Sequence, residues 1–362
     1  MTAMDKLSDA RGIVTVTDLR GMAVKSMEML AAVPDRSVKA RAKRAAKRFL
    51  KRSSASEKDP IFWPAGFLML GLAGYAEAFP DDEAAAGCLD AVRERLEEWK
   101  KDGGKVRYAD DSLAGCAMLM CHRLTGESCY MDMADGICEY LVDEAPKDAE
   151  GALIYHPSPV NSCIYADGTG MSALFLSGYA AAGGKDGDKA LELAGRELAS
   201  FMKHGTDEQT GLPYHGYLLT DGGSQEKKGL VGWGRAVGFL LMGMSSYCGI
   251  TDDPEIKEYY ETMTAAALKR QRADGCFPWL LTAADGHVDT AATAMIGWAL
   301  ANTGNGQHER ETMSIAAGLK RYLKDGAMTE ALAECVDFGE HPQRYGCYPW
   351  GQGASLAFFS RL

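Results

Sequence analysis

Six apolar helical segments alternate with six polar ones along most of this chain, and this alternation limits its fold more than any other feature. The apolar segments are residues 62–79, 110–124, 167–182, 230–247, 289–301 and 351–359. The polar or amphipathic segments are residues 37–51, 82–101, 128–142, 188–203, 253–272 and 309–323. Pairs of this kind recur at roughly 50 to 65 residues, and such a period indicates a repeat architecture.

A closed double ring satisfies both kinds of segment. A helix that is apolar on every side must be buried all round, whereas an amphipathic helix buries one face only. Six inner helices can therefore form a barrel, and six outer helices can cover it while keeping one face in water. Small residues such as Gly66, Gly115, Gly170 and Gly238 allow the inner helices to approach closely. No segment shows a convincing two-residue alternation, so we expect little β-structure.

The sequence thus predicts an all-α protein with the (α/α)6 toroid fold, also called a six-hairpin barrel. We expect one catalytic domain over residues 1–362, in which residues 1–36 could form an N-terminal extension. The basic segment 37–51 supplies the sixth outer helix in this scheme, and we interpret it as a solvated helix face.

Charge and cysteine usage restrict the partners and the compartment. The net charge of −11 disfavours nucleic acid and anionic membrane surfaces as partners. No apolar run reaches membrane-spanning length, and the N-terminus carries no long apolar run. The ten cysteines stand singly, without a CxxC pair, and several fall inside apolar runs as small hydrophobic residues. We therefore expect a reduced, cytoplasmic protein.

Two of the apolar segments open with the same tripeptide, Tyr-Ala-Asp, which ends at Asp110 and at Asp167. A carboxylate at a helix start commonly accepts hydrogen bonds from free backbone N–H groups, so capping is one interpretation of each. If the two helices lie side by side, however, both carboxyls meet at one rim of the ring. Neighbouring carboxyls split their pKa values, so one of them can stay protonated near neutral pH and act as an acid.

The loops that lead into the apolar segments are rich in aromatic, glycine and polar residues, and in a closed ring they gather on one face. They are residues 60–63, 107–111, 155–157, 212–217, 232–235, 285–290 and 348–353. Aromatic platforms beside hydrogen-bonding groups suit a sugar, which has apolar faces and a polar rim. A ring mouth with this lining is the expected binding site.

An ordered series of short motifs supports a carbohydrate enzyme. The series contains Trp63, Asp110-Asp111 with Gly115, Leu-Thr-Gly-Glu at 124–127, Tyr-Ala-Asp at 165–167, Gly-Leu-Pro-Tyr-His at 211–215, Trp-Gly-Arg-Ala-Val-Gly at 233–238, Val-Asp-Thr-Ala-Ala-Thr-Ala-Met at 288–295 and Gly-Gln-Gly-Ala at 351–354. In order and spacing these motifs resemble the unsaturated glucuronyl and rhamnogalacturonyl hydrolases of glycoside hydrolase families 88 and 105.

The resemblance implies a hydrolase that removes a 4,5-unsaturated uronic acid from the non-reducing end of lyase-generated oligosaccharides. Asp167 matches the family's general acid/base, which protonates C4 of the vinyl ether before water adds at C5. Asp110 matches the second carboxylate, and Asp111, one residue away, is the alternative. His215, Trp233 and Arg235 match substrate-contacting residues of the family. The aromatic residues Trp63 and Tyr108 are expected to line the mouth.

Structural alternatives stay open for these residues. One of Asp110 and Asp111 can cap its helix, His215 can be a turn or core histidine, and Arg235 can belong to a structural salt bridge. Trp63 suits the core as well as a sugar platform. Other functions also fit a toroid: an inverting glycosidase, a sugar epimerase or a degenerate sugar-binding protein. We expect no metal and no cofactor, because no cluster of ligands has suitable spacing.

Overall fold

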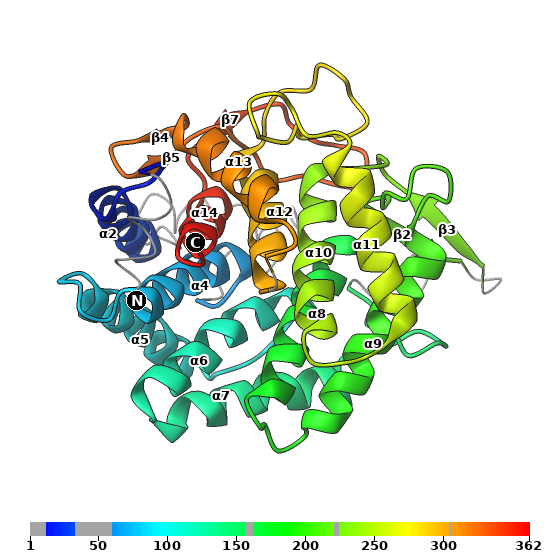
Figure 1. The fold of residues 1–362 in the computed structure, drawn as a ribbon. Coiled ribbons are helices and arrows are strands. Elements are labelled where there is room, and N and C mark those ends of the chain that lie inside the picture. Colours follow the sequence, from blue (N-terminus) through cyan, green and yellow to red (C-terminus); the bar gives the residue numbers. More distant parts are fainter. Residues whose placement is uncertain (1–11, 33–59, 156–161, 221–223, 305) are drawn as a thin grey trace, which may run out of the picture.

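Six helices form a closed inner ring in the computed structural model, which describes residues 12–32, 60–155, 162–220, 224–304 and 306–362. They are α4 (Trp63–Ala78), α6 (Ser112–Thr125), α8 (Ala166–Ala181), α10 (Gly234–Cys248), α12 (Thr290–Asn302) and α14 (Pro349–Phe359). Each packs against the next along the chain, and α14 packs against α4, which closes the ring (Figure 1). All six correspond to the predicted apolar segments.

The outer layer follows the predicted alternation. It contains α5 (Ala85–Lys101), α7 (Ser128–Glu139), α9 (Gly187–Gly205), α11 (Pro254–Leu268) and α13 (Glu309–Lys320). Each packs on the inner helix that precedes it in the chain. The all-α (α/α)6 prediction is therefore confirmed.

The sixth outer position is occupied by α2 (Val16–Ala32), which packs against α4, α5 and α14. This helix lies within residues 1–36, the range that the sequence suggested as an extension. The basic segment 37–51, which we expected in the sixth position, lies outside the described residues. The apolar character of Leu19, Met22 and Leu30, all buried, explains why α2 packs on the ring.

Backbone contact between the inner helices depends on glycine. A Cβ atom added at Gly170 of α8 would lie 2.3 Å from the Phe239 carbonyl oxygen of α10, and one added at Gly353 of α14 would lie 2.3 Å from the Phe67 carbonyl oxygen of α4. Any side chain at these two positions would force the helices apart. The close approach predicted from Gly170 is thus present in the structure.

Short strands occupy the connections. An antiparallel sheet in the order β1-β2-β3 contains β1 (Ser162–Tyr165), β2 (Gly216–Leu219) and β3 (Gln225–Lys228). Two smaller pairs join β4 (Leu323–Lys324) to β5 (Ala327–Met328), and β6 (Ala331–Leu332) to β7 (Tyr345–Gly346). Strand β1 runs directly into α8, and its pairing with β2 places His215 beside the start of that helix.

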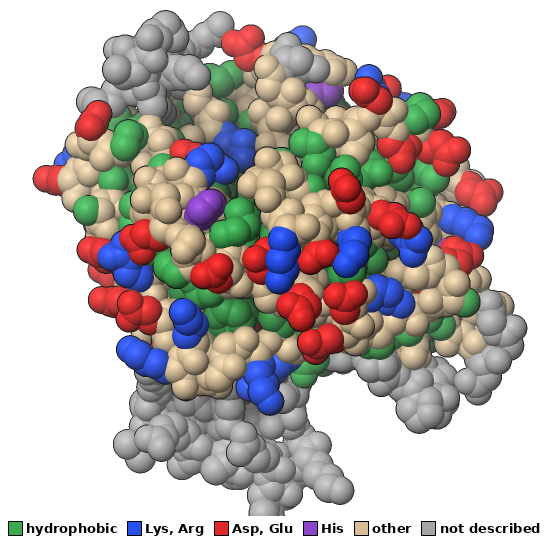
Figure 2. Space-filling model, turned by 90° about the horizontal axis from the view of Figure 1, so that it is seen from below, with side chains coloured by type: hydrophobic (Ala, Val, Ile, Leu, Met, Phe, Trp, Pro, Cys, Tyr) green, Lys and Arg blue, Asp and Glu red, His purple; other side chains and the backbone are tan. Residues whose placement is uncertain are grey.

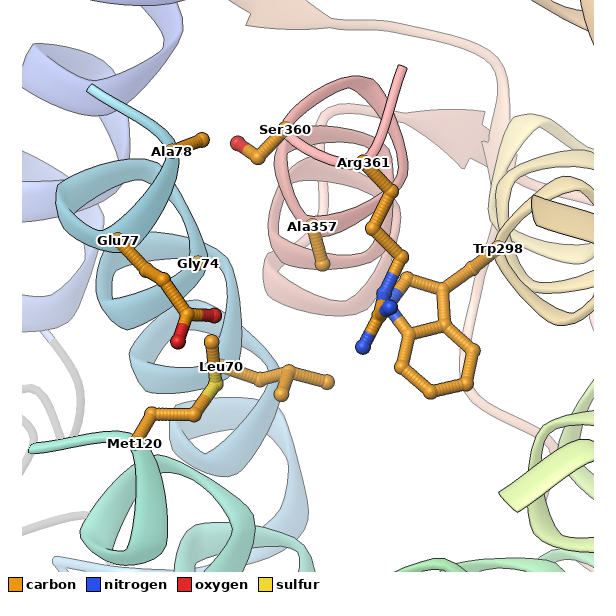
Figure 3. A pocket seen from close by; sticks show the side chains of 9 residues that line it. All are labelled: Leu70, Gly74, Glu77, Ala78, Met120, Trp298, Ala357, Ser360 and Arg361. Atoms are coloured by element: carbon orange, nitrogen blue, oxygen red, sulfur yellow. The ribbon is translucent and has the colours of Figure 1, made fainter. Parts of the chain in front are cut away.

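The two ends of the ring differ in character. The N-terminal ends of the inner helices carry the loops that we expected at the mouth. The C-terminal ends of α4, α6, α12 and α14 enclose a cavity of about 220 Å³, in which the Arg361 guanidinium lies 4.2 Å over the Trp298 ring (Figure 3). On the face seen in Figure 2, acidic and basic side chains are interspersed. Among the described residues, no helix is long and apolar enough to cross a membrane.

Candidate active site

Asp111 holds the turn that precedes α6. The short 3₁₀ helix η2 (Ala109–Asp111) carries both carboxylates of this segment. The Asp111 Oδ2 atom accepts hydrogen bonds from the backbone N–H groups of Arg107, at 2.9 Å, and Tyr108, at 3.2 Å. The sequence left open which of Asp110 and Asp111 has a capping role. Asp111 makes these backbone hydrogen bonds and therefore caps the turn.

Asp110 is buried in the same turn, with 1 % of its surface exposed. Its Oδ2 atom accepts a hydrogen bond of 2.6 Å from the Tyr155 hydroxyl, while Oδ1 has no hydrogen-bond partner among the described residues. Burial raises the pKa of Asp110 well above its usual range, and the charges of Asp111 and Asp167 raise it further, whereas the Tyr155 hydrogen bond opposes the shift. The surroundings of Asp110 thus favour its protonated form.

Asp167 lies in the first turn of α8 and remains partly exposed. The Gly168 backbone N–H lies 3.2 Å from its Oδ1 atom. Because α6 and α8 are neighbours in the ring, Asp167 is close enough for its charge to raise the pKa values of Asp110 and Tyr155. The two carboxyls that the repeated tripeptide singled out therefore meet at one rim of the ring.

His215 lies beside the start of α8, the helix that carries Asp167. Its carbonyl oxygen accepts a hydrogen bond of 3.0 Å from the Ala166 backbone N–H, at the start of α8. Burial lowers the pKa of His215 to about 4, although the Phe338 carbonyl, 3.4 Å from Nδ1, opposes the shift. The imidazole is therefore neutral near pH 7. Its contact with the Phe338 oxygen assigns the proton to Nδ1.

Trp233 packs against His215 in a tilted arrangement, with ring centroids 4.4 Å apart and an angle of 55° between the ring planes. It precedes α10, and its side chain is fully buried. The indole Nε1 atom has no hydrogen-bond acceptor among the described residues. An N–H donor buried in this way is costly, so it marks a place where a ligand can supply the missing acceptor.

Arg235 is held under the aromatic residues, with 1 % of its surface exposed. Its Nη1 atom donates to the Leu332 carbonyl at 2.6 Å and its Nη2 atom to the Ala333 carbonyl at 3.1 Å. The guanidinium carbon lies 4.9 Å from the Trp233 ring centroid and 5.4 Å from that of Trp350. These contacts fix the guanidinium, and a role in binding the substrate carboxylate stays a prediction.

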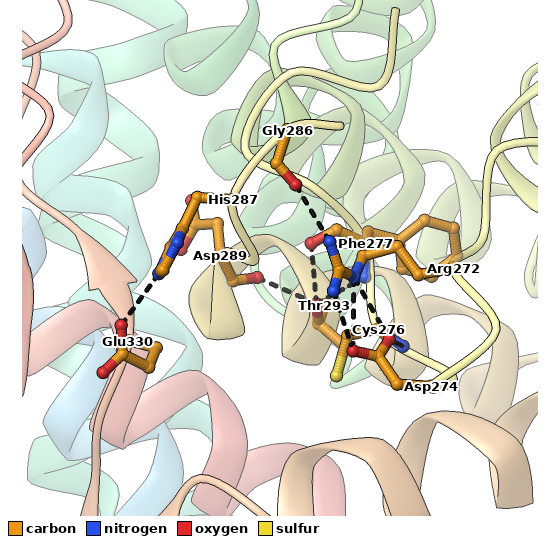
Figure 4. Close-up of polar contacts among 9 residues, drawn as sticks. All are labelled: Arg272, Asp274, Cys276, Phe277, Gly286, His287, Asp289, Thr293 and Glu330. Atoms are coloured by element: carbon orange, nitrogen blue, oxygen red, sulfur yellow. Dashed lines mark hydrogen bonds and ion pairs between the residues drawn. The ribbon is translucent and has the colours of Figure 1, made fainter. Parts of the chain in front are cut away.

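Asp289 balances the charge of Arg235. Burial raises the pKa of Asp289, and the positive charge of Arg235 opposes this shift. Its Oδ1 atom accepts from the backbone N–H groups of Ala291, at 3.1 Å, and Leu332, at 3.0 Å. In the same segment the Thr293 hydroxyl donates to the Asp289 carbonyl, and His287 contacts Glu330 (Figure 4). The start of α12 is thus firmly positioned beneath the site.

Aromatic rings flank the carboxyl pair. Tyr108 stacks on Tyr155, with centroids 6.1 Å apart, and both are only partly buried. Trp63 is also partly exposed, and its ring lies 4.9 Å from that of Trp350. Tyr348 and Trp350 stack in parallel, 4.8 Å apart. Trp63 and Tyr108 are both accessible, and their role as platforms for a sugar stays a prediction.

Three residues of this site had no individual role in the sequence interpretation: Tyr155, Asp289 and His341. The first two fall in loops that were expected at the mouth, and their partners could have been guessed only with the fold in hand. His341 lies in the connection between β6 and β7, which no motif covered. Among the described residues, no group of three His, Cys, Asp or Glu side chains could hold a metal ion.

Comparisons with known proteins identify the family of this chain. The model of Glycosyl Hydrolase Family 88 matches residues 37–332. The unsaturated rhamnogalacturonyl hydrolase YesR of Bacillus subtilis (strain 168) is 24 % identical over 316 residues, which cover 82 % of this chain and 88 % of that protein.

Solved structures share the fold. A possible member of the GH105 family from Klebsiella pneumoniae superposes with a TM-score of 0.78 at 15 % identity, over 96 % of this chain and 93 % of that one. An unsaturated glucuronyl hydrolase specific for heparin gives a TM-score of 0.67 at 17 % identity, over 83 % and 86 % of the two chains. The match to the family model covers most of the chain, and the protein is therefore a glycoside hydrolase that belongs to glycosyl hydrolase family 88.

Proposed function

We propose that this enzyme removes a 4,5-unsaturated uronic acid from the non-reducing end of oligosaccharides produced by polysaccharide lyases. The observation that carries the proposal is the carboxyl pair, in which Asp110 is buried with a raised pKa and Asp167 is partly exposed beside it. The names of YesR and of the structural neighbours support the same substrate class. We propose a single catalytic domain that needs no cofactor.

The chemistry requires an acid that can protonate carbon. In the proposed reaction a proton adds to C4 of the vinyl ether and the oxygen of a water molecule bonds to C5, which gives a hemiketal. The ring then opens to a C5 ketone, and the hemiacetal left at C1 releases the neighbouring sugar. Water is the only other reactant, and no oxidation or reduction occurs. A general acid for this step must be protonated near neutral pH.

The carboxyl pair can meet this requirement as a unit. Burial, and then the charges of Asp111 and Asp167, raise the pKa of Asp110, so the site can hold a proton at a pH at which an isolated aspartate has lost it. We assign the transfer to C4 to Asp167, because it is the member that solvent and substrate can reach. Asp110, under Tyr155, keeps the shared proton available. Asp111 holds the turn.

The remaining residues suit substrate binding. Trp233 offers an N–H donor that has no acceptor among the described residues, and the neutral His215 keeps Nε2 as an acceptor, 4.0 Å from the Cys335 Sγ atom. Arg235 is the candidate to receive the substrate carboxylate, since a cation is needed locally in a protein of net charge −11. None of the ten cysteines forms a disulfide, which is in keeping with a reducing, cytoplasmic location, and we propose that location.

The direct test uses unsaturated disaccharides made by lyases. Turnover destroys the conjugated alkene, so the ultraviolet absorbance of the substrate falls with time. Rhamnose-linked and glycosaminoglycan-derived disaccharides should be compared, because relatives of both kinds resemble this chain. Turnover of saturated glycosides without any turnover of unsaturated ones would contradict the proposal and favour an inverting glycosidase, while isomerisation of a free sugar would favour an epimerase.

A further inference from the structure

The loop between β6 and β7, residues 333–344, lies against the candidate active site. The Phe338 ring packs on Tyr165, with centroids 4.5 Å apart, and the Phe338 carbonyl takes the hydrogen bond of His215. Glycine makes this approach feasible: a Cβ atom at Gly216 would lie 2.8 Å from the Phe338 ring, and one at Gly229 would lie 2.6 Å from its carbonyl oxygen. The loop is thus docked on the site.

His341 enters the site from this loop. Its ring centroid lies 5.1 Å from that of Trp233, 5.5 Å from that of His215 and 5.7 Å from that of Trp279. Only 8 % of its surface is exposed. Neither Nδ1 nor Nε2 has a hydrogen-bond partner among the described residues.

The protonation state of His341 defines what it can bind. Burial lowers its pKa to about 4, and the neighbouring His215 and Arg235 add to this shift. The Phe338 carbonyl opposes the shift weakly but lies outside hydrogen-bond geometry for either ring nitrogen. The neutral ring has one N–H donor and one acceptor nitrogen, and both are unsatisfied. A carboxylate could accept from the N–H group but could not donate to the other nitrogen, whereas hydroxyl groups can satisfy both.

A purely structural role explains His341 poorly. A ring that only fills space among Trp233, Trp279 and His215 would be more stable without two buried polar atoms. The same cluster contains a third unsatisfied polar atom, the Trp233 Nε1 donor. Three such atoms in one aromatic cluster, on the rim that bears the carboxyl pair, suit a ligand whose hydroxyl groups can both donate and accept.

We propose that His341 is a substrate-positioning residue that binds the hydroxyl groups of a sugar ring, donating from one nitrogen and accepting at the other. The loop 333–344 thereby helps to select which sugar the enzyme accepts. This inference rests on the proposed function and extends it by naming a specificity residue. His341 has no part in the proton transfer, so its loss should weaken substrate binding more than the chemical step.

Two variants test the proposal in the full-length enzyme. His341→Phe keeps the ring and removes both polar atoms, and it should raise KM about 10-fold or more while kcat changes less than KM. His341→Gln keeps a donor and an acceptor in another geometry, so it should restore part of the loss. The matched control is His204→Phe, since His204 also stacks on an aromatic ring, Tyr217, but its Nε2 pairs with Glu150 away from the site.

The melting temperature without substrate gives a second readout. His341→Phe should melt at the same temperature as the wild type or higher, because it removes unsatisfied buried groups. A lower melting temperature would show that the ring already has a structural partner and would overturn the proposal. So would an unchanged KM in a folded His341→Phe enzyme. The thermal measurement needs no substrate, so it still decides about His341 if the wild type fails to act on unsaturated sugars.

Discussion

The chain uses one tripeptide twice, and the two copies end in different environments. In the first copy, Tyr108 to Asp110, the aspartate is turned inward and 1 % exposed. In the second, Tyr165 to Asp167, the aspartate remains partly exposed at the rim. The fold, more than the local sequence, therefore decides how exposed each carboxyl is, and we propose that this difference decides which one holds a proton and which one meets the substrate.

The residue that follows each copy explains the difference. After Asp110 comes Asp111, whose carboxylate binds two backbone N–H groups and tightens the turn, with Asp110 beneath Tyr155. After Asp167 comes Gly168, where an added Cβ atom would meet Tyr155 at 3.4 Å and no other described residue within 4 Å. Strand β1 leads into the start of α8 in an extended conformation, and Gly168 places no side chain beside Asp167.

The largest effect should come from the exposed carboxyl. Asp167→Asn should fold normally and lose about 10²- to 10⁴-fold in turnover, because an amide cannot give a proton to carbon. The ultraviolet assay measures the rate, and circular dichroism checks that the helical content is unchanged. A folded Asp167→Asn enzyme with normal turnover would move the acid to another residue.

Substitution of Asp110 in the buried copy should lower turnover less than substitution of Asp167. Substitution of the next residue, Asp111, should affect mainly stability. Asp110→Asn should lower kcat by about 10²-fold with little loss of stability, because the amide replaces a carboxyl that is largely protonated. Asp111→Asn should instead lose about 1 kcal/mol of stability by weakening the cap, with a smaller effect on kcat. Thermal melts and kcat for both variants give the comparison. If Asp111→Asn damages kcat more, the second carboxylate is Asp111.

The contrast between these copies also shows what the sequence could predict. The alternation of apolar and polar segments predicted the ring, because burial on all sides leaves an inner helix few alternatives. It also placed both tripeptides at helix starts on one rim. It could not show that Asp110 is covered by Tyr155 or that His341 reaches Trp233, because these contacts join residues far apart in the chain. Nor did it show that α2 takes the sixth outer position, since that depends on the packing of the whole ring.

A smaller effect is expected from the Tyr155 hydroxyl, which donates a hydrogen bond to the Asp110 carboxyl. Tyr155→Phe removes the hydrogen bond that stabilises ionised Asp110, so the pKa of Asp110 should rise further. Activity that needs a protonated pair is lost as pH rises through its pKa. The falling limb of the pH profile should therefore move to higher pH, and kcat should drop about 10-fold at the optimum.

The control for Tyr155→Phe lies in the same region. Tyr140→Phe removes a hydroxyl that donates to the Arg107 carbonyl at 2.8 Å, on the same turn. It should leave the falling limb of the pH profile in place. If both variants shift that limb equally, the hydrogen bond of Tyr155 has no special effect on the carboxyl pair.

The smallest effect on the rate should come from Glu197, which connects the segment before Tyr155 to α8, the helix that carries Asp167. Its Oε1 atom accepts from the Leu153 backbone N–H at 2.5 Å, two residues before Tyr155, and Oε2 accepts from the Ser172 hydroxyl at 3.0 Å, on the helix of Asp167. Burial raises the pKa of Glu197 to about 7. In the unfolded chain it titrates near its usual value of about 4.3.

A carboxyl whose pKa is raised on folding gives its full stability below the unfolded value and loses it as pH rises through the folded value. Native stability should therefore fall by roughly 3 kcal/mol between about pH 4.5 and pH 7 on account of this group. Glu197→Gln removes the titration, so its stability relative to wild type should increase across that range, while kcat changes by about 2-fold or less. Thermal melts at pH 5 and pH 8 measure this difference. The matched control is Glu192→Gln, which changes an exposed carboxylate on the same helix. If Glu197→Gln changes the pH dependence of stability no more than Glu192→Gln does, the raised pKa of Glu197 is contradicted.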